Sequence, residues 1–330
     1  MPQLLGKTIG PTGYGLMGLT WRPEPQEDEE SIRAMKASLE AGCNFWNGGE
    51  FYGPPERNSL QLLNKYFTKY PEDAEKVVLS IKGVIDIEKL RPDGSPEGVK
   101  KSVERCLELL DGKKKIDIFE PARVDKNTPI ETTLKALEEY VKAGKIGGIS
   151  LSEVSANTIH RAVKVTKIVG CEVELSLWAT DIFKNGVAAA CAEHGIPVIA
   201  YSPIGRGILT GEIKKPEDIP KNDMRSHMPR FQGENFEKNL ELVQRLEDFA
   251  KQRGCTPAQL ALSWVRHLSQ KNGNPEIIPI PGATKVERIL ENAKDYPLSG
   301  EESATIDSIL QSFEVVGERY GGPQAELMEG

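Results

Sequence analysis

Short apolar runs of strand length alternate with amphipathic segments along most of this chain. In the amphipathic segments, apolar residues recur every three or four positions, which predicts helices with one buried face. The expected strands cover 43–47, 77–81, 116–120, 147–152, 171–177 and 197–201. The expected helices between them cover 58–68, 96–111, 129–143, 156–167 and 185–194. This alternation predicts a parallel sheet covered by helices.

The N-terminal part adds a hairpin and one more strand–helix unit. Closely spaced glycines indicate the hairpin, and the strand that follows it is expected to end within Leu16–Trp21. In the next helix Ile32, Met35 and Leu39 share one face, and Gly42 follows its end as a cap.

The C-terminal part completes the pattern. After a polar loop at 212–234 we expect a helical region broken at Gly254, an eighth strand and two more helices, at 235–270, 276–281, 284–293 and 301–313. Eight strands with helices between them predict one (β/α)8 TIM barrel domain over 1–330, with an N-terminal hairpin and extra C-terminal helices. A doubly wound sheet is the alternative.

A barrel places its chemistry at the carboxyl ends of its strands. Tyr52 follows the second expected strand in a glycine-rich segment, and Lys82 ends the third. A phenol has a pKa of about 10 and becomes a useful acid near neutral pH only when a cation lowers that value. We therefore predict that Tyr52 donates a proton and that Lys82 is the cation. An amphipathic tyrosine at the rim of a core is the alternative.

Composition and residue spacing argue against several other classes of protein. The net charge of -7, with interspersed signs, argues against a nucleic-acid surface. The five cysteines are widely spaced and form no Cys-x-x-Cys pair, as expected of reduced core thiols. No apolar stretch has the length of a membrane span and no signal-peptide pattern opens the chain, so we expect a cytoplasmic protein, also nuclear by diffusion, that does not engage a membrane. No pair of ligand residues has metal-site spacing at adjacent strand ends, so no metal is predicted.

The strand ends together resemble the aldo-keto reductase superfamily, from Gly13 to about Tyr320. The run from Tyr201 to Gly211 is similar to the family's strand-seven signature. The run from Ile278 to Asn292 is similar to its strand-eight cofactor segment, and 144–153 to its strand-five motif. The resemblance implies NADPH as the cofactor. No Gly-x-Gly-x-x-Gly segment follows the first strand, so a dinucleotide must bind by a route other than the Rossmann one.

The resemblance also implies roles for individual residues. Tyr201 would stack on the nicotinamide, and Ser152 and Glu172 would hydrogen-bond its carboxamide. Lys285 and Arg288 share a helix face beside exposed backbone N–H groups, which suits the 2′-phosphate of NADPH; two solvated surface cations are the alternative. The other implied cofactor residues are Glu153, Ser202, Pro203, Ile204, Gly205, Arg206, Gly282, Thr284, Glu291 and Asn292.

Two positions depart from the family pattern. Asn47 stands where the family usually has Asp, and Ala122 where it has His. The run Asn-Gly-Gly-Glu-Phe-Tyr-Gly at 47–53, with Ala-Arg-Val-Asp at 122–125, is similar to the fungal pyridoxal reductase branch. This resemblance implies reduction of the aldehyde of pyridoxal to pyridoxine.

We therefore predict hydride transfer from NADPH to the pyridoxal aldehyde, with Tyr52, Lys82 and Asn47 as the catalytic residues. Asn47 would orient Lys82 without neutralising it, so Lys82 is expected to deprotonate more readily than with a carboxylate partner. At Ala122 the substrate's own phenol would supply the hydrogen bond of the absent imidazole. The expected pocket residues are Ala122, Arg123, Trp21 and Phe51, with Trp46 and Trp178 as further candidates for its aromatic wall.

Other functions fit the same sequence. Barrel loops set specificity, so a reductase of other aldehydes or ketones is one alternative, with the loop 212–234 and the tail 317–323 shaping the pocket. An NADPH-binding regulatory subunit with weak catalysis is another, because the usual Asp and His are missing. A small-molecule aldehyde is the only partner predicted, and the sequence indicates no oligomeric state.

Overall fold

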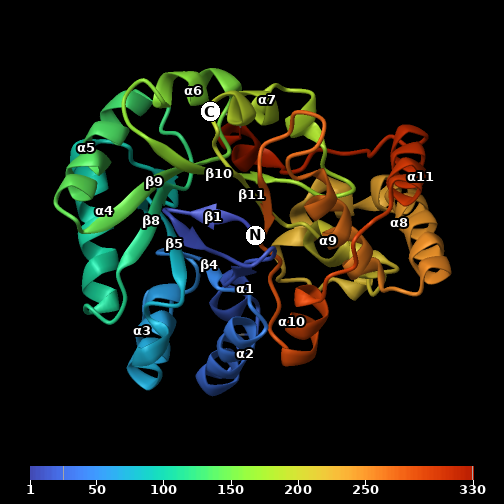
Figure 1. The fold of residues 1–330 in the computed structure, drawn as a ribbon, viewed down its shortest axis with the longest axis horizontal. Coiled ribbons are helices and arrows are strands. Elements are labelled where there is room, and N and C mark those ends of the chain that lie inside the picture. The colour runs from blue at the N-terminus through green and yellow to red at the C-terminus, as the bar shows by residue number, and fades with distance from the viewer. Residues whose placement is uncertain (25, 329) are drawn as a thin grey trace.

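Eight parallel strands form the centre of the fold (Figure 1). The computed structural model describes residues 1–24, 26–328 and 330. In chain order the eight strands are β3 (Tyr14–Gly15), β4 (Phe45–Gly49), β5 (Val78–Gly83), β8 (Ile116–Pro121), β9 (Ile146–Ser152), β10 (Ile168–Glu174), β11 (Val198–Tyr201) and β12 (Ile277–Pro279). Neighbours in the sheet are also neighbours in this order, as expected of strands joined by helices on one outer side.

The first and last strands meet and close the sheet. The N–H of Gly13 donates to the carbonyl of Pro279 at 2.9 Å, and Gly15 pairs in parallel with Gly282. A Cβ on Gly15 would lie 2.9 Å from the carbonyl oxygen of Ile280, so this seam requires glycine. The fold is therefore a (β/α)8 barrel, and the doubly wound alternative is wrong.

Amphipathic helices surround the strands in Figure 1. They are α2 (Asp28–Glu40), α3 (Ser59–Lys69), α4 (Pro96–Leu110), α5 (Ile130–Lys142), α6 (Ala156–Ala162), α7 (Val187–Glu193), α9 (Pro257–Leu268) and α10 (Val286–Ala293). Polar caps define several starts; the side chain of Asn58, for example, accepts from the N–H groups of Leu60 and Gln61. Such a cap is worth about 1 kcal/mol. The extra helices α8 (Gly233–Arg253) and α11 (Gly300–Gln311) pack on each other beside the barrel.

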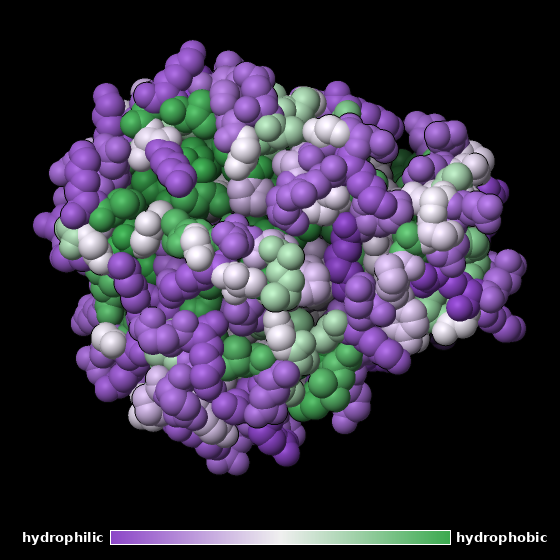
Figure 2. All heavy atoms as spheres, in the orientation of Figure 1, coloured by the Kyte–Doolittle hydropathy of each residue, from purple (hydrophilic) through white to green (hydrophobic). Residues whose placement is uncertain are grey.

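The hairpin of β1 (Gln3–Leu4) and β2 (Lys7–Thr8) closes one end of the barrel. Leu4 and Ile9 join a cluster inside it with residues of the strands: Phe45, Val78, Ile118, Val169, Ile199, Ile278 and Ile280. A larger apolar core fills the space between strands and helices. In Figure 2 hydrophilic side chains dominate the rim, and hydrophobic residues show mainly between the helices. The hairpin covers one end of the barrel, so the carboxyl ends of the strands at the other end are where polar side chains can meet a ligand.

Some local predictions are wrong. The segment expected to end the first strand forms the short helix α1 (Met17–Thr20), and α6 ends at Ala162, before the expected residue 167. A small hairpin of β6 (Ile85–Asp86) and β7 (Arg91–Pro92) was not expected. The break at Gly254 is confirmed, because that residue has a φ of 74° and ends α8. In the described chain, helices with the length and apolar character of a membrane span are absent.

Candidate active site

Tyr52 lies buried in the turn that follows β4. Its carbonyl oxygen accepts from the hydroxyl of Thr20 at 2.7 Å and from the N–H of Ser59 at 3.0 Å. The phenol ring lies over Gly49, where a Cβ would come within 3.0 Å of the ring carbon Cγ. Gly49 therefore makes room for the ring, and the bonds from Thr20 and Ser59 hold the turn that carries it.

The neighbouring Glu50 secures the same turn from the barrel wall. Its Oε2 accepts from the hydroxyl of Ser102 at 2.9 Å and from the thiol of Cys106 at 3.4 Å, both on α4. Burial raises the pKa of Glu50. These carboxyl contacts hold the turn on α4, and the backbone N–H of Glu50 donates to the carbonyl of Lys82 at 3.0 Å.

Two buried carboxyl groups surround Lys82. Its Nζ donates to Oε1 of Glu172 at 2.5 Å and lies 3.4 Å from Oε1 of Glu120. The hydroxyl of Ser152 is 3.2 Å away. Burial disfavours the ammonium, but Glu120 and Glu172 outweigh burial and raise the pKa of Lys82. The expectation that Lys82 lacks a carboxylate partner and deprotonates more readily is therefore wrong.

Asn47 contacts the two carboxyl groups rather than Lys82. Its Nδ2 donates to Oε1 of Glu120 at 3.0 Å and to Oε2 of Glu172 at 2.6 Å. Any orienting effect of Asn47 on Lys82 therefore passes through these carboxyl groups. We call Asn47, Lys82, Glu120 and Glu172 the Lys82 cluster.

Glu120 is the member that sequence reasoning missed. It lies in β8 directly beside Lys82 in the parallel register of β5 and β8. The available signal was a carboxylate near the carboxyl end of β8, a strand whose other carboxylate, Asp117, lies near its start.

Burial also governs the Tyr52 phenol. Burial raises the pKa of Tyr52, Lys82 lowers it, and Glu172 and Glu120 raise it again, so that the net shift is upward. The predicted effect of Lys82 is present, but it offsets only part of the others. The phenol is therefore protonated at neutral pH, as a proton donor must be.

The rings of Trp21 and Phe51, the predicted aromatic wall, lie beside the ring of Tyr52. The Trp21 and Tyr52 ring centres are 5.9 Å apart, and those of Phe51 and Tyr52 are 4.9 Å apart. Trp21 is 40% exposed, so its ring is open to a ligand. Trp46 is wrong as a wall candidate, because it is fully buried against Tyr66.

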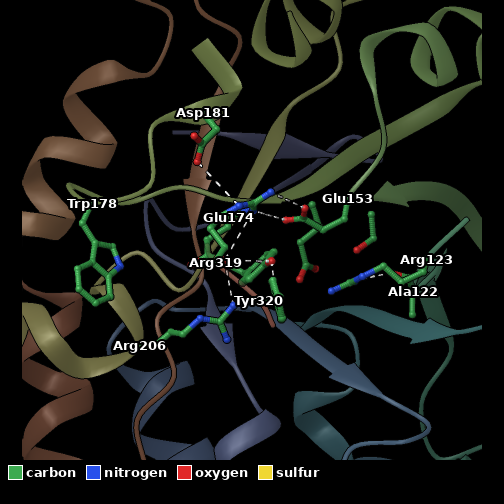
Figure 3. Close-up of polar contacts among 12 residues, drawn as sticks. Ala122, Arg123, Glu153, Glu174, Trp178, Asp181, Arg206, Arg319 and Tyr320 are labelled. Atoms are coloured by element: carbon green, nitrogen blue, oxygen red, sulfur yellow. Dashed lines mark hydrogen bonds and ion pairs between the residues drawn. The ribbon is translucent and has the colours of Figure 1, made fainter. Parts of the chain in front are cut away.

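Ala122 and Arg123 lie at the end of β8, close to this site. Ala122 is buried, and Nη1 of the half-buried Arg123 donates to its carbonyl at 2.6 Å. The positive charge of Arg123 acts to lower the pKa of Tyr52. Figure 3 shows Arg123 pointing towards the side of Tyr320 and Glu153. The charge of Arg123 also acts on Glu153, whose pKa it helps to lower.

A second ion-pair network spans the barrel mouth (Figure 3). We call it the mouth cluster, and it comprises Glu153, Glu174, Arg206, Arg319 and Tyr320. Nη2 of Arg206 donates to Oε2 of Glu174 at 2.9 Å and to the hydroxyl of Tyr320 at 2.7 Å. Nη1 of Arg319 lies 3.3 Å from Oε1 of Glu153 and 3.7 Å from Oε2 of Glu174. The C-terminal segment thus binds directly to strand ends.

This network holds several predicted cofactor residues. The hydroxyl of Tyr201 lies 3.0 Å from that of Tyr320, and Glu153 and Arg206 are already ion-paired. Glu153, Ser202 and Arg206 all have a φ near +50° (49°, 50° and 56°), a strained conformation that concentrates at functional sites. Pro203, Ile204 and Gly205 complete the turn between Ser202 and Arg206. Sequence reasoning did not find the roles of Glu174 and Arg319.

The residues predicted to bind the 2′-phosphate of NADPH lie at the start of α10. Lys285 is exposed and is the N-cap of this helix, but its side chain makes no cap hydrogen bond, so the first N–H groups lack a side-chain acceptor. Arg288 is exposed and pairs with Glu291 at 2.7 Å and with Glu212. Gly282 and Thr284 precede the helix, and Asn292 is buried within it. Open N–H groups beside cations fit a nucleotide phosphate.

One group of potential metal ligands occurs in the described chain, formed by His160, Glu193 and His194 on α6 and α7. Nδ1 of His160 lies 2.9 Å from Nε2 of His194, a distance that a hydrogen bond between the two rings explains. It involves none of the predicted site residues.

Tyr52 and Lys82 both lie buried at the mouth of a (β/α)8 barrel, an arrangement that fits an oxidoreductase. A family model described as the Aldo/keto reductase family matches residues 11–311. The chain belongs to this family, whose members act on small aldehydes or ketones with a nicotinamide cofactor.

Relatives in the family are close over nearly the whole chain. A probable pyridoxal reductase 2 of Schizosaccharomyces pombe is 43% identical, with 97% of each chain covered. A putative pyridoxal reductase of Saccharomyces cerevisiae is 42% identical, with 94% of this chain and 95% of that protein covered. The structure of a glycerol dehydrogenase from Gluconobacter oxydans matches with a TM-score of 0.80 at 25% identity, covering 94% of each chain.

Proposed function

We propose that this protein reduces the aldehyde of pyridoxal to the alcohol of pyridoxine, with NADPH as the hydride source. The observation that carries the proposal is the buried Tyr52 at the strand ends with the buried Lys82, bordered by the rings of Trp21 and Phe51. The two relatives named as pyridoxal reductases support the choice of substrate.

The residues divide between the cofactor and the substrate. When bound, the cofactor supplies the hydride. Lys285, Arg288 and the open N–H groups of α10 would hold its 2′-phosphate, which is the group that distinguishes NADPH from NADH. Ser152, Glu153 and Tyr201 lie at strand ends where they would hold the nicotinamide end, and Glu172 lies within β10 beside Ser152, with its oxygens bonded to Lys82 and Asn47.

Tyr52 donates its proton to the substrate oxygen as negative charge develops there. Lys82 stabilises the phenolate that remains, because it keeps its own charge. Such general acid catalysis contributes about 10²–10⁴-fold in rate.

The pocket also suits the other groups of pyridoxal. An aromatic ring can pack against Trp21, which is partly exposed. Ala122 leaves space beside the reacting carbonyl, where the substrate's own phenol can supply the hydrogen bond of the absent imidazole. Arg123 adjoins that space and can pair with the same oxygen when it is ionised.

The test compares substrates and cofactors under one set of conditions. Oxidation of NADPH is followed with pyridoxal, pyridoxal 5′-phosphate, 3-deoxypyridoxal and benzaldehyde, and the pyridoxal assay is repeated with NADH. We expect pyridoxal to give the highest kcat/KM and NADPH to be preferred. Equal turnover of pyridoxal and the 3-deoxy compound would remove the role given to the substrate phenol. Faster turnover of benzaldehyde would point to a general aldehyde reductase instead.

A further inference from the structure

The charges of the Lys82 cluster do not balance. Lys82, Glu120 and Glu172 are 4%, 1% and 2% exposed, so water cannot compensate them. One ammonium faces two carboxyl groups within 3.4 Å, and Asn47 adds only a neutral donor. An uncompensated buried charge costs several kcal/mol, and a group so placed changes its protonation state instead.

Within the part of the chain that the structure describes, no second cation contacts the glutamate pair. The groups that face it are Asn47 on β4, Lys82 on β5, Ser152 on β9, Cys171 on β10, Tyr201 on β11 and the phenol of Tyr52. Lys82 is the one cation among these groups, and the others carry no charge when they hold their protons. With both carboxyl groups ionised, the cluster would therefore carry a net negative charge in a buried site.

The hydrogen bonds give a second, independent indication that the glutamate pair holds a proton. The donors of Asn47 and Lys82 go to both oxygens of Glu172 and to Oε1 of Glu120. Oε2 of Glu120 is buried and has no hydrogen-bond partner among the described residues. An ionised carboxylate needs donors at both oxygens, whereas a carboxyl pair that holds a proton supplies one donor of its own.

We infer that Glu120 and Glu172 hold one proton between them and act as positioning residues, providing a single negative charge opposite Lys82. The pair thereby does the work of the carboxylate that the family resemblance places at Asn47. The kinetic consequence rests on the proposed reductase function, but the protonation state itself does not.

The electrostatics name Glu172 as the group that titrates. Burial and the adjacent Glu120 raise the pKa of Glu172 to about 8, against the opposing charge of Lys82. Above that pH the cluster gains a second negative charge, and Glu172 is one of the groups that raise the pKa of Tyr52. Tyr52 then becomes a weaker acid, so aldehyde reduction slows as the pH rises through about 8.

Infrared spectroscopy tests the proton directly on the purified chain without substrate. In the wild type, a protonated-carboxyl band should disappear as the pH is raised from about 7 to about 9. Glu172→Gln should lack this transition, and Glu120→Gln should move it to lower pH, because Glu172 then faces Lys82 alone. Glu50→Gln is the matched control, since it removes a different buried carboxyl and should leave the transition in place.

The kinetic arm measures kcat for aldehyde reduction over the same pH range. We expect the wild-type kcat to fall roughly tenfold across the transition, and Glu172→Gln to lose that inflection. A wild-type spectrum with no titrating carboxyl band, or a band unchanged by both glutamine variants, would overturn the inference. A band that behaves as expected in a protein that does not reduce pyridoxal would instead refute the proposed function alone.

Discussion

The Lys82 cluster and the mouth cluster each contain two buried glutamates, but they differ in the number of cations that face them. The Lys82 cluster has one cation for its two glutamates. The mouth cluster has two arginines, Arg206 and Arg319, for its two glutamates, and Arg319 also lies 3.8 Å from the half-exposed Asp181. Glu172 and Glu153 are 2% and 3% exposed, so exposure does not distinguish the clusters.

The number of nearby cations shifts the pKa of a buried glutamate in opposite directions in the two clusters. Burial and Glu120 raise the pKa of Glu172 to about 8. At the mouth burial acts in the same upward direction, but Arg319 and Arg123 overcome it and lower the pKa of Glu153. A buried glutamate is therefore an acid or an anion according to its neighbours, and only the Lys82 cluster is poised to titrate near neutral pH.

Removing the single cation should have the largest effect. In Lys82→Met, Tyr52 keeps its burial but loses the charge that stabilises its phenolate. We expect kcat for pyridoxal to fall about 1,000-fold, within the range of general acid catalysis. Stopped-flow measurement of NADPH oxidation checks this, and Lys82→Arg is the control because it restores a cation. A loss of less than about tenfold in Lys82→Met would mean that Tyr52 does not depend on this charge.

Removing one arginine from the mouth cluster should leave it with one cation for two glutamates, as in the Lys82 cluster. Arg206→Gln leaves Glu174 with Arg319 as its remaining charged partner. Breaking a buried pair costs about 3 kcal/mol of unfolding free energy, which urea denaturation at neutral pH measures. Arg206→Lys is the control, because it keeps a cation at the same position and should recover part of the loss. An equal loss in both variants would show that packing, rather than charge, is lost.

The two glutamates should also give opposite pH dependence of stability. Glu172 has a raised pKa when folded, so its contribution is present below its ordinary value of 4.5 and is lost as the pH rises through about 8. Glu153 has a lowered pKa, so its contribution is present above its ordinary value and is lost as the pH falls through the lowered one.

The last expected effect is a difference in slope. Between pH 4.5 and about 8, Glu172→Gln should lose less stability than the wild type as the pH rises, by at most about 5 kcal/mol over the range, since each unit of pKa shift corresponds to about 1.4 kcal/mol. Glu153→Gln should instead be less stable than the wild type at neutral pH, and this difference should disappear as the pH falls to acid values. Thermal unfolding across this range measures both slopes. Parallel curves for both variants and the wild type would contradict the comparison.

The sequence predicted the barrel from its periodicity, and the catalytic roles of Tyr52 and Lys82 stay predictions. Strand-length runs place Tyr52 and Lys82 at adjacent carboxyl ends without any knowledge of side-chain contacts. Alternation within β4 would also have corrected Trp46, since Asn47 faces the interior and its neighbour must face the helices. The apolar run at Leu16–Trp21 is too short to separate a strand from the helical turn that forms there.

The contacts that set the charge of the site could not be predicted in the same way. Glu120 pairs with Lys82 through the register of two strands, and register depends on how the whole barrel closes. Arg319 and Tyr320 reach the mouth from a segment with no periodic pattern, so the sequence placed it near the pocket but not on Glu153. The state of a buried charge depends on such long-range neighbours.

The central claim, that Tyr52 is the proton donor for aldehyde reduction, is tested most directly by Tyr52→Phe. The variant keeps the ring that packs on Gly49 and removes only the hydroxyl. We predict that single-turnover oxidation of bound NADPH by pyridoxal slows at least about 100-fold while the affinity for NADPH, followed by its fluorescence, is unchanged. Turnover within a factor of about three of the wild type would contradict the assignment of the acid.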